Sequence, residues 1–308
     1  MIQFRIKSDK AIGFAIIDVK EGEKDDLKGY IYNAEGLFLE HIEGSDNVFL
    51  AEKYTENISE SSKNKYEYST ELKDLQITHT NFIYIAGVLV KEDSSSFEAA
   101  AAVVQTTFNA VKLRKGDSLT IKKQAEYAAK LLKTAYSSVT NKVNLEDDDV
   151  KSNAKNMRKG LIHVLQGKLD YSDGAILWDG IDFADKGPLH NKATKDGGIS
   201  ISKKMWDDFV DVCSFDKDDK LQYGKRETKE VVKEKFPFGQ EIETVKLTFA
   251  NVYNVTDSLY ESLGTGKYNK DRILYKVSVV KGKQIYWAVN EDHEKNKNYE
   301  FKFLITDF

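Results

Sequence analysis

The stretch that decides the fold is Asn81-Phe-Ile-Tyr-Ile-Ala-Gly-Val-Leu-Val90, followed directly by Lys91 and Glu92. The run is short and almost wholly apolar, which is typical of a buried helix. A second helix is expected to begin near Ser95, because Ser95-Ser-Phe-Glu98 has the form of a capping box. Glu92 would then lie between the end of one buried helix and the start of the next. A carboxyl group in such a place is partly removed from water and can serve as a general acid.

The helical pattern continues beyond this pair. The second helix should run through the alanine-rich stretch after Ser95 to about Val111. Further helices are predicted at about 119–138, 149–166 and 203–213, and Gly167 should end the helix at 149–166. The segment 169–187 is rich in glycine and aspartate and has no helical period. Because it is too long for a simple turn, we expect an ordered loop of the kind that often carries function.

Residues that favour β-strands dominate both ends of the chain. Residues 1–60 should form hairpins, with Asn33-Ala-Glu-Gly36 as the clearest turn, and the polar stretch 56–74 should be a connection. Strand-like runs return at 244–249, 273–280, 284–289 and 299–305, with Lys281-Gly282-Lys283 as a hairpin turn. The sequence therefore predicts an α+β fold, with a β hairpin module at 1–60, a helical domain at 75–215 and a β-rich segment at 220–308.

Charge and composition exclude several classes of function. The 308 residues include 46 basic and 50 acidic side chains, for a formal net charge of -4, and no Lys/Arg-rich stripe offers phosphate contacts, so a nucleic-acid partner is not expected. No run reaches the ~18 apolar residues of a membrane span. The 5 histidines are scattered and no phosphate-binding glycine motif occurs, so we expect neither a metal nor a cofactor.

A second chemistry-bearing segment follows the helix predicted at 149–166. It reads Asp170-Tyr-Ser-Asp-Gly-Ala-Ile-Leu-Trp178, and Asn109 lies near the end of the alanine-rich helix. In order, the chain has a glutamate, a polar loop and an alanine-rich helix with Asn, and then a helix, a Gly and an Asp-x-Ser-x-Gly-Ala-aromatic loop. This order resembles that of the cell-wall hydrolase family of the spore-cortex-lytic enzymes. The resemblance covers roughly residues 80–185. It implies a lysozyme-like catalytic domain, here within 75–215, that cleaves the glycan strands of peptidoglycan.

The resemblance also implies roles for individual residues. Glu92 matches the family's catalytic general acid, and Asn109 matches the Asn of its Asn-Arg pair. The residues that match the loop lining the sugar groove are Asp170, Ser172, Gly174, Ala175 and Trp178, and Asp173 in the same loop is expected to bind the sugar with them. The chain departs from the family pattern at three positions, where Ala110 stands for an Arg, Tyr171 for a Pro and Asp173 for a Gly. For the family's later His-aromatic segment, His190 is the candidate.

The chemistry of glycoside cleavage fits this assignment. A carboxylic acid must protonate the leaving oxygen, and a carboxyl group packed against apolar side chains keeps its proton closer to neutral pH. Ordinary hydrolysis needs a second carboxylate, for which Asp173, Asp179 and Asp182 are the candidates. Without a second carboxylate, the substrate's own 6-hydroxyl can close on the anomeric carbon to give a 1,6-anhydro sugar. The resemblance implies that this lytic transglycosylase reaction is available.

Simpler interpretations stay open beside these. Glu92 could be a solvated carboxylate at a helix end, Glu98 is accounted for by its capping box, and Trp178 suits either a core position or a sugar-stacking platform. The N-terminus shows no Sec signal, so an activity at the cell wall or periplasm would require another route, such as a phage particle or a contractile injection apparatus. The alternative function is a non-catalytic structural or interaction protein of such an apparatus that keeps a lysozyme-like shape.

Overall fold

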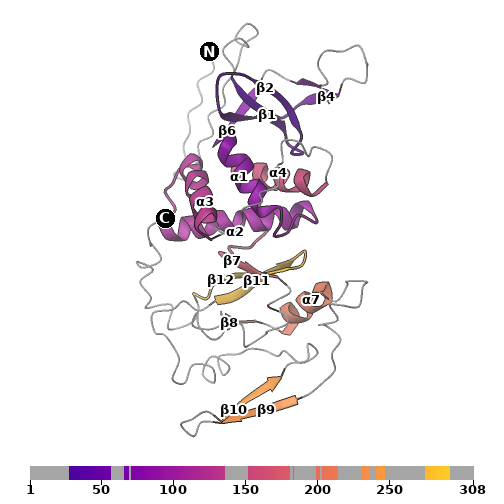
Figure 1. Cartoon of the computed structure of the whole chain (residues 1–308), viewed down its shortest axis with the longest axis vertical. Coiled ribbons are helices and arrows are strands. Elements are labelled where there is room, and N and C mark those ends of the chain that lie inside the picture. The colour runs from indigo at the N-terminus through magenta and orange to yellow at the C-terminus, as the bar shows by residue number, and fades with distance from the viewer. Residues whose placement is uncertain are drawn as a thin grey trace, which may run out of the picture.

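The computed structural model describes residues 28–56, 66–68, 71–135, 152–180, 183, 199–201, 203–213, 230–235, 241–246 and 275–291. Helices and sheets are both present in these ranges, so the chain is an α+β protein. Figure 1 shows one sheet above a layer of helices and a second sheet below it. Across the described ranges, no helix is both long and apolar enough to cross a membrane.

The first sheet contains strands in the order β2-β1-β3-β6. These strands are β1 (Gly29–Asn33), β2 (Phe38–Ile42), β3 (Asn47–Ala51) and β6 (Leu72–Thr78). β1 runs antiparallel to β2 and parallel to β3, and β3 runs antiparallel to β6. The predicted turn between β1 and β2 is confirmed. Asn33 Oδ1 accepts hydrogen bonds from the backbone N–H groups of Glu35 and Leu37 at 3.0 and 2.8 Å, and Gly36 has a φ of 77°.

The predicted polar connection at 56–74 is wrong in part. β4 (Tyr54–Glu56) pairs antiparallel with β5 (Tyr66–Tyr68). β6 begins at Leu72 and continues to Thr78, where the helical domain was predicted to begin at 75. Leu72 and Leu75 are both buried at a spacing of three, and Gln76 between Leu75 and Ile77 has a φ of 56°. This irregular residue breaks the period of two on which strand prediction depends.

Four helices form the central layer. They are α1 (His79–Leu89), α2 (Phe97–Lys115), α3 (Ile121–Ala135) and α4 (Ser152–Leu165). The predicted capping box at the head of α2 is wrong by one residue. Ser96 is the N-cap, and its Oγ accepts a hydrogen bond from the Ala99 N–H at 3.1 Å. Glu98 is therefore one position too early to bond back to the cap, and Ser95 instead donates its hydroxyl proton to Asp93 Oδ1 at 2.7 Å.

Small residues allow α2 to pass close to α4 through the centre of the protein. Ala99, Ala100 and Ala102 are fully buried. A Cβ placed on Gly160 of α4 would lie 2.8 Å from the Ala101 nitrogen, so only glycine fits there without a shift of the helices. Gly167 ends α4 as predicted, with a φ of 64° and its N–H donating to the Val164 carbonyl at 2.9 Å.

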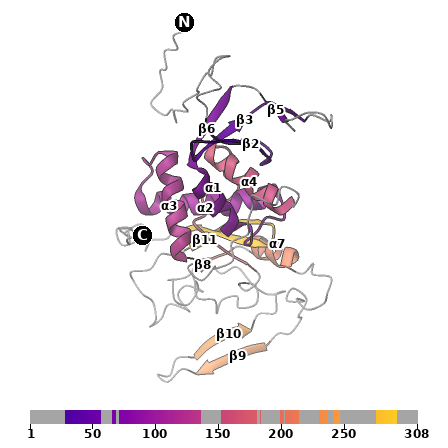
Figure 2. The same ribbon diagram turned by 45° about the horizontal axis from the view of Figure 1, so that its top comes forward.

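The second sheet joins segments that are far apart in the sequence. Its order is β7-β12-β11-β8, with β7 (Leu177–Asp179), β8 (Ile199–Ser200), β11 (Tyr275–Lys281) and β12 (Gln284–Val289). The hairpin turn predicted at Lys281-Gly282-Lys283 is confirmed, and it joins β11 to β12. The segment 169–187 was expected to be a loop, but it contains β7, which pairs antiparallel with β12. Figure 2 shows this sheet packed under the helical layer.

Several predicted elements fall at or beyond the edges of the described ranges. The predicted helix at 203–213 is confirmed as α7 (Lys203–Cys213). β9 (Glu230–Lys235) and β10 (Glu241–Lys246) form an antiparallel pair, and β10 overlaps the strand predicted at 244–249. The strand predicted at 299–305 and the hairpins predicted before residue 28 lie outside the described residues.

Candidate active site

The loop that carries Glu92 is held by its own polar side chains. The Glu92 N–H donates to the Leu89 carbonyl at 2.9 Å, which continues the last turn of α1, and Ser94 Oγ donates to the Val90 carbonyl at 2.8 Å. Asp93 is only 8% exposed, and its Oδ1 accepts the Ser95 N–H at 3.0 Å. These bonds turn the chain from α1 into α2 within seven residues, from Val90 to Ser96.

The β11–β12 hairpin fixes this loop from the other end of the chain. The Lys283 N–H donates to Asp93 Oδ2 and Gln284 Nε2 donates to the Glu92 carbonyl, both at 3.0 Å. Gly282 at the tip has a φ of 54°, and a Cβ there would lie 2.0 Å from Asp93 Oδ2, so the turn needs glycine for both its conformation and its close approach. The hairpin therefore sets the backbone position of Glu92.

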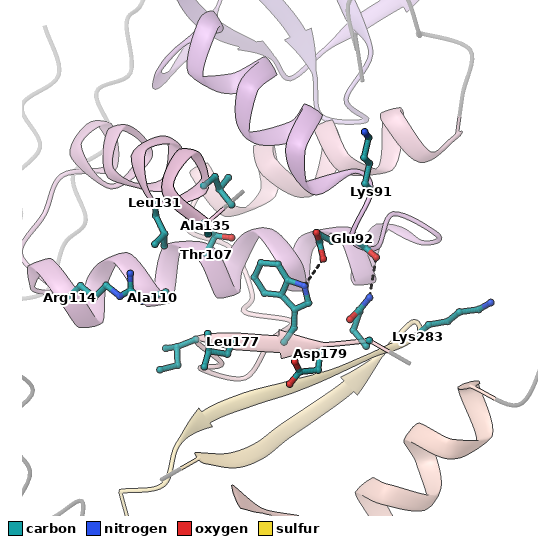
Figure 3. A pocket seen from close by; sticks show the side chains of 15 residues that line it. Lys91, Glu92, Thr107, Ala110, Arg114, Leu131, Ala135, Leu177, Asp179 and Lys283 are labelled. Carbon is teal, nitrogen blue, oxygen red and sulfur yellow. Dashed lines mark hydrogen bonds between the residues drawn. The ribbon is translucent and has the colours of Figure 1, made fainter. Parts of the chain in front are cut away.

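The Glu92 side chain is half-buried and bonded to a tryptophan. Trp178 Nε1 of β7 donates to Glu92 Oε2 at 3.0 Å, as Figure 3 shows. Below the loop, Tyr286 Oη lies 3.5 Å from the Ala99 carbonyl that accepts its proton. Burial, with smaller effects from Asp93 and Glu92, raises the pKa of Tyr286 well above its usual value, so this phenol stays neutral. The indole bond fixes the orientation of the Glu92 carboxylate.

Glu92 opens onto a pocket of about 760 Å³ between the helical layer and the second sheet. The pocket is lined by Lys91, Glu92, Thr107, Ala110, Arg114, Leu131, Leu132, Ala135, Ile176, Leu177, Trp178, Asp179, Gly180, Lys283 and Gln284. These residues come from the α1–α2 loop, α2, α3, β7 and its flanking residues, and the β11–β12 hairpin. Their mixture of apolar walls and a few charged groups is typical of a small-molecule or glycan site.

The charged residues of the pocket are spread along it. Figure 3 shows Arg114 at one end and Glu92 well away from it, with the side chains of Lys91 and Lys283 pointing outward. Burial lowers the pKa of the Arg114 guanidinium below its usual value, partly offset by Tyr275. The guanidinium nevertheless remains charged at neutral pH, because its ordinary pKa is so high.

Asp179 lines the same pocket but is bonded differently from Glu92. Its Oδ2 accepts the Trp287 Nε1 proton at 2.7 Å. Because alternate residues of a strand point to opposite faces, Trp178 reaches Glu92 while the Asp179 carboxylate lies on the other side of β7, as Figure 3 shows. Of the other predicted second carboxylates, Asp173 is exposed and is absent from the pocket lining, and Asp182 lies outside the described residues.

Most of the residues predicted to bind the sugar are bonded to one another. Asn109 Nδ2 lies 3.0 Å from Asp170 Oδ2, 3.2 Å from Ser172 Oγ and 3.1 Å from the Ala175 carbonyl, and donates to this group of acceptors. Asp170 Oδ1 accepts the Ser172 hydroxyl proton at 2.6 Å, and Ser172 and Ala175 are fully buried. This network ties α2, at Asn109, to the loop that leads into β7.

The remaining two loop residues form its outer turn. Asp173 and Gly174 are exposed and have φ values of 50° and 76°. The Gly174 N–H donates to Asp170 Oδ2 at 3.0 Å. Of the predicted site residues, Glu92 and Trp178 line the pocket, whereas Asn109, Asp170, Ser172, Asp173, Gly174 and Ala175 lie beside it in the supporting loop network.

The pocket also contains residues that sequence reasoning missed. Arg114, Lys283 and Gln284 had no motif to mark them, although Arg114 follows Ala110 by one helical turn and so shares its face of α2. His190, the candidate for the family's later segment, lies outside the described residues. Within the described ranges, no group of three or more His, Cys, Asp or Glu side chains is placed to hold a metal ion.

No protein-family model, curated protein or solved structure matches this chain.

Proposed function

We propose that the protein cleaves the glycan strands of peptidoglycan between N-acetylmuramic acid and N-acetylglucosamine, with Glu92 as the general acid. The observation that carries the proposal is that Glu92 opens onto a pocket while Trp178, from the other sequence motif, donates a hydrogen bond to its carboxylate. The two motifs that suggested the lysozyme-like family are thereby in direct contact. A scaffold protein would have no need of a half-buried acid facing a cavity of this size.

In this reaction Glu92 protonates the oxygen that leaves from the anomeric carbon, and the bond between that oxygen and carbon breaks. The 6-hydroxyl of the muramic acid then bonds to the anomeric carbon and gives its proton back to Glu92. The product is a 1,6-anhydro sugar, and the acid is restored without water. Asp179 is turned toward Trp287 on the other side of β7, which supports this single-acid route over hydrolysis.

Trp178 has two uses in this scheme. Its Nε1 bond holds Oε2 of Glu92, so the carboxyl group keeps one orientation toward the pocket. Its ring is part of the pocket wall, where an aromatic face can stack on a sugar ring. The supporting loop network of Asn109 and Asp170 acts on the reaction only through the placement of β7.

The experiment is digestion of purified sacculi with the wild type and with Glu92→Gln. The variant should lose at least about a hundredfold in turnover, the usual contribution of a general acid, while its thermal unfolding is unchanged. Glu98→Gln is the matched control, because Glu98 is an exposed carboxylate in the first turn of α2 and does not line the pocket. Full activity in Glu92→Gln would show the assignment to be wrong.

Mass spectrometry of the digest distinguishes the two forms of the reaction. Anhydro ends are expected if Glu92 works alone. Reducing ends would instead require a second carboxylate, and Asp179→Asn would then be the variant to test. If the wild type does not cleave sacculi at all, the alternative of a non-catalytic protein of a phage or injection apparatus is favoured. The formal net charge of -4 is consistent with this alternative, because many wall-degrading proteins are basic.

A further inference from the structure

We propose that Arg114 binds a carboxylate of the substrate, so that the pocket selects a glycan bearing acid groups over a neutral glycan. This inference rests on the proposed function, since it names the kind of glycan that the Glu92 pocket takes. Peptidoglycan has such groups on the attached peptides, and on the lactyl ether of each muramic acid that carries no peptide, whereas chitin has none.

The first support is the position of Arg114 within the pocket. It lies on α2 one turn after Ala110, and a helical side chain leans toward the N-terminal turn, so the guanidinium extends over the small Ala110 side chain. The neighbouring walls are Leu131 and Leu177, which are apolar. A charge beside apolar walls is screened less than one in water, so a carboxylate that enters this end gains more from it.

The second support is the direction of the charged side chains around the pocket. Of the three cationic residues that line it, Lys91 and Lys283 are exposed and Figure 3 shows their side chains pointing outward, whereas the Arg114 side chain lies along the pocket. Of the two carboxylates, Glu92 accepts the Trp178 indole proton, and Asp179 is bonded to Trp287 on the other side of β7. A carboxylate that enters the Arg114 end therefore meets a cation there, away from both acids.

The third support is the separation between Arg114 and the acid. Thr107 and Arg114 both line the pocket from α2, and seven residues of helix span roughly 10 Å. Figure 3 shows Glu92 near the middle of the pocket and Arg114 at its end. A carboxylate bound at Arg114 therefore belongs to a part of the substrate away from the bond that breaks, where it can contribute to selection without entering the reaction.

The test measures binding in the Glu92→Gln background, so that no ligand is consumed. The two probes are chitohexaose, which is neutral, and peptide-free glycan strands prepared from sacculi, which keep the lactyl carboxylates. The parent should bind the acidic glycan more tightly, and added Arg114→Gln should weaken this binding by about tenfold while leaving chitohexaose unchanged. Arg114→Lys, which keeps the charge, should recover most of the loss, and raising the salt concentration should narrow the difference between the probes.

Lys112→Gln is the matched control, because it removes one positive charge from the same helix at a position that does not line the pocket. It should leave both affinities as they are. Equal binding of the two probes by the parent, equal loss of both in Arg114→Gln, or the same loss in Lys112→Gln would each overturn the inference. Cleavage of sacculi by the wild type tests the proposed function separately, so a failure of the proposed function can be told apart from a failure of the inference about Arg114.

Discussion

Replacing Asn109 by alanine should destabilise the protein without touching the pocket. The Asn109 amide has only two protons, and it lies within 3.0–3.2 Å of acceptors on Asp170, Ser172 and Ala175, so two full bonds are shared among three acceptors. Its Oδ1 accepts one more bond, from Gln105 Nε2 at 3.0 Å. Three bonds at ~1 kcal/mol each set an upper value of about 3 kcal/mol.

Part of this loss is recovered by bonds that remain. Asp170 Oδ2 keeps the Gly174 N–H at 3.0 Å, and Ser172 keeps its bond to Asp170 Oδ1 at 2.6 Å. Among the bonds described for it, the Ala175 carbonyl has no other donor, and because Ala175 is fully buried this carbonyl would be left unpaired. The expected loss in the free energy of unfolding for Asn109→Ala is therefore about 2 kcal/mol.

Urea unfolding followed by the helical circular dichroism signal measures this loss, because Asn109 is on α2. The matched control is Asp173→Asn in the same loop, an exposed position whose left-handed φ an asparagine tolerates, and it should change stability by less than ~0.5 kcal/mol. Adding Asp170→Ala to Asn109→Ala should show a coupling energy of about 1 kcal/mol. A loss below ~0.5 kcal/mol for Asn109→Ala, with reduced glycan binding instead, would refute the supporting role and restore a direct contact with the sugar.

Three further changes test other parts of the structure. Trp178→Phe keeps an aromatic ring but removes the bond to Glu92, so turnover on sacculi should fall by about tenfold with little change in KM, whereas Trp178→Ala should change both. Gly282→Ala puts a Cβ 2.0 Å from Asp93 Oδ2 at a φ of 54°. It should lower the free energy of unfolding in urea by about 1–2 kcal/mol and should also lower turnover. If both values were unchanged, the hairpin would not have the role in placing Glu92 that we assign to it. Burial lowers the pKa of His79 from 6.5 to about 4, so the folded protein binds this proton less readily than the unfolded chain. The contribution of His79 to the free energy of unfolding is therefore fully present above pH 6.5 and is lost as the pH falls toward 4. Between about pH 7 and pH 4.5 the loss from His79 should be about 2 kcal/mol, and His79→Phe should flatten that part of the pH profile.

The sequence predicted the helical layer well because the signals there are local. Apolar periodicity, the serine before α2 and Gly167 after α4 each act within a few residues, and the structure confirms the helices with shifts of a few residues at their ends. β6 was missed because the irregular Gln76 breaks its alternation. β7 was missed because three residues are too few to show a period, and its strand conformation depends on pairing with β12 more than 100 residues later.

The site shows the same division between local and distant signals. Glu92 and Trp178 were predicted from motifs and lie together, yet the groups that fix the Glu92 loop, Lys283 and Gln284, are 190 residues or more farther along the chain. No local pattern marks such a contact. Asn109 and Asp170 were each predicted to bind the sugar, and the structure places them in one hydrogen-bonded network. A motif indicates that residues belong to the same site, but it does not indicate whether they face the ligand or each other.

Whether Asp179 can act beside Glu92 follows from the geometry of β7. Trp178 and Asp179 are adjacent on one strand, so their side chains must point to opposite faces. Trp178 Nε1 is bonded to Glu92 and Asp179 Oδ2 to Trp287 Nε1, which fixes each face to a different partner. Moving the Asp179 carboxylate to the Glu92 side would require a shift of β7 by one residue against β12, and this shift would break both indole bonds and turn Trp178 away from the pocket. The same strand register that presents Trp178 to Glu92 therefore turns the Asp179 carboxylate away from it, which is why we expect anhydro rather than reducing ends in the digest.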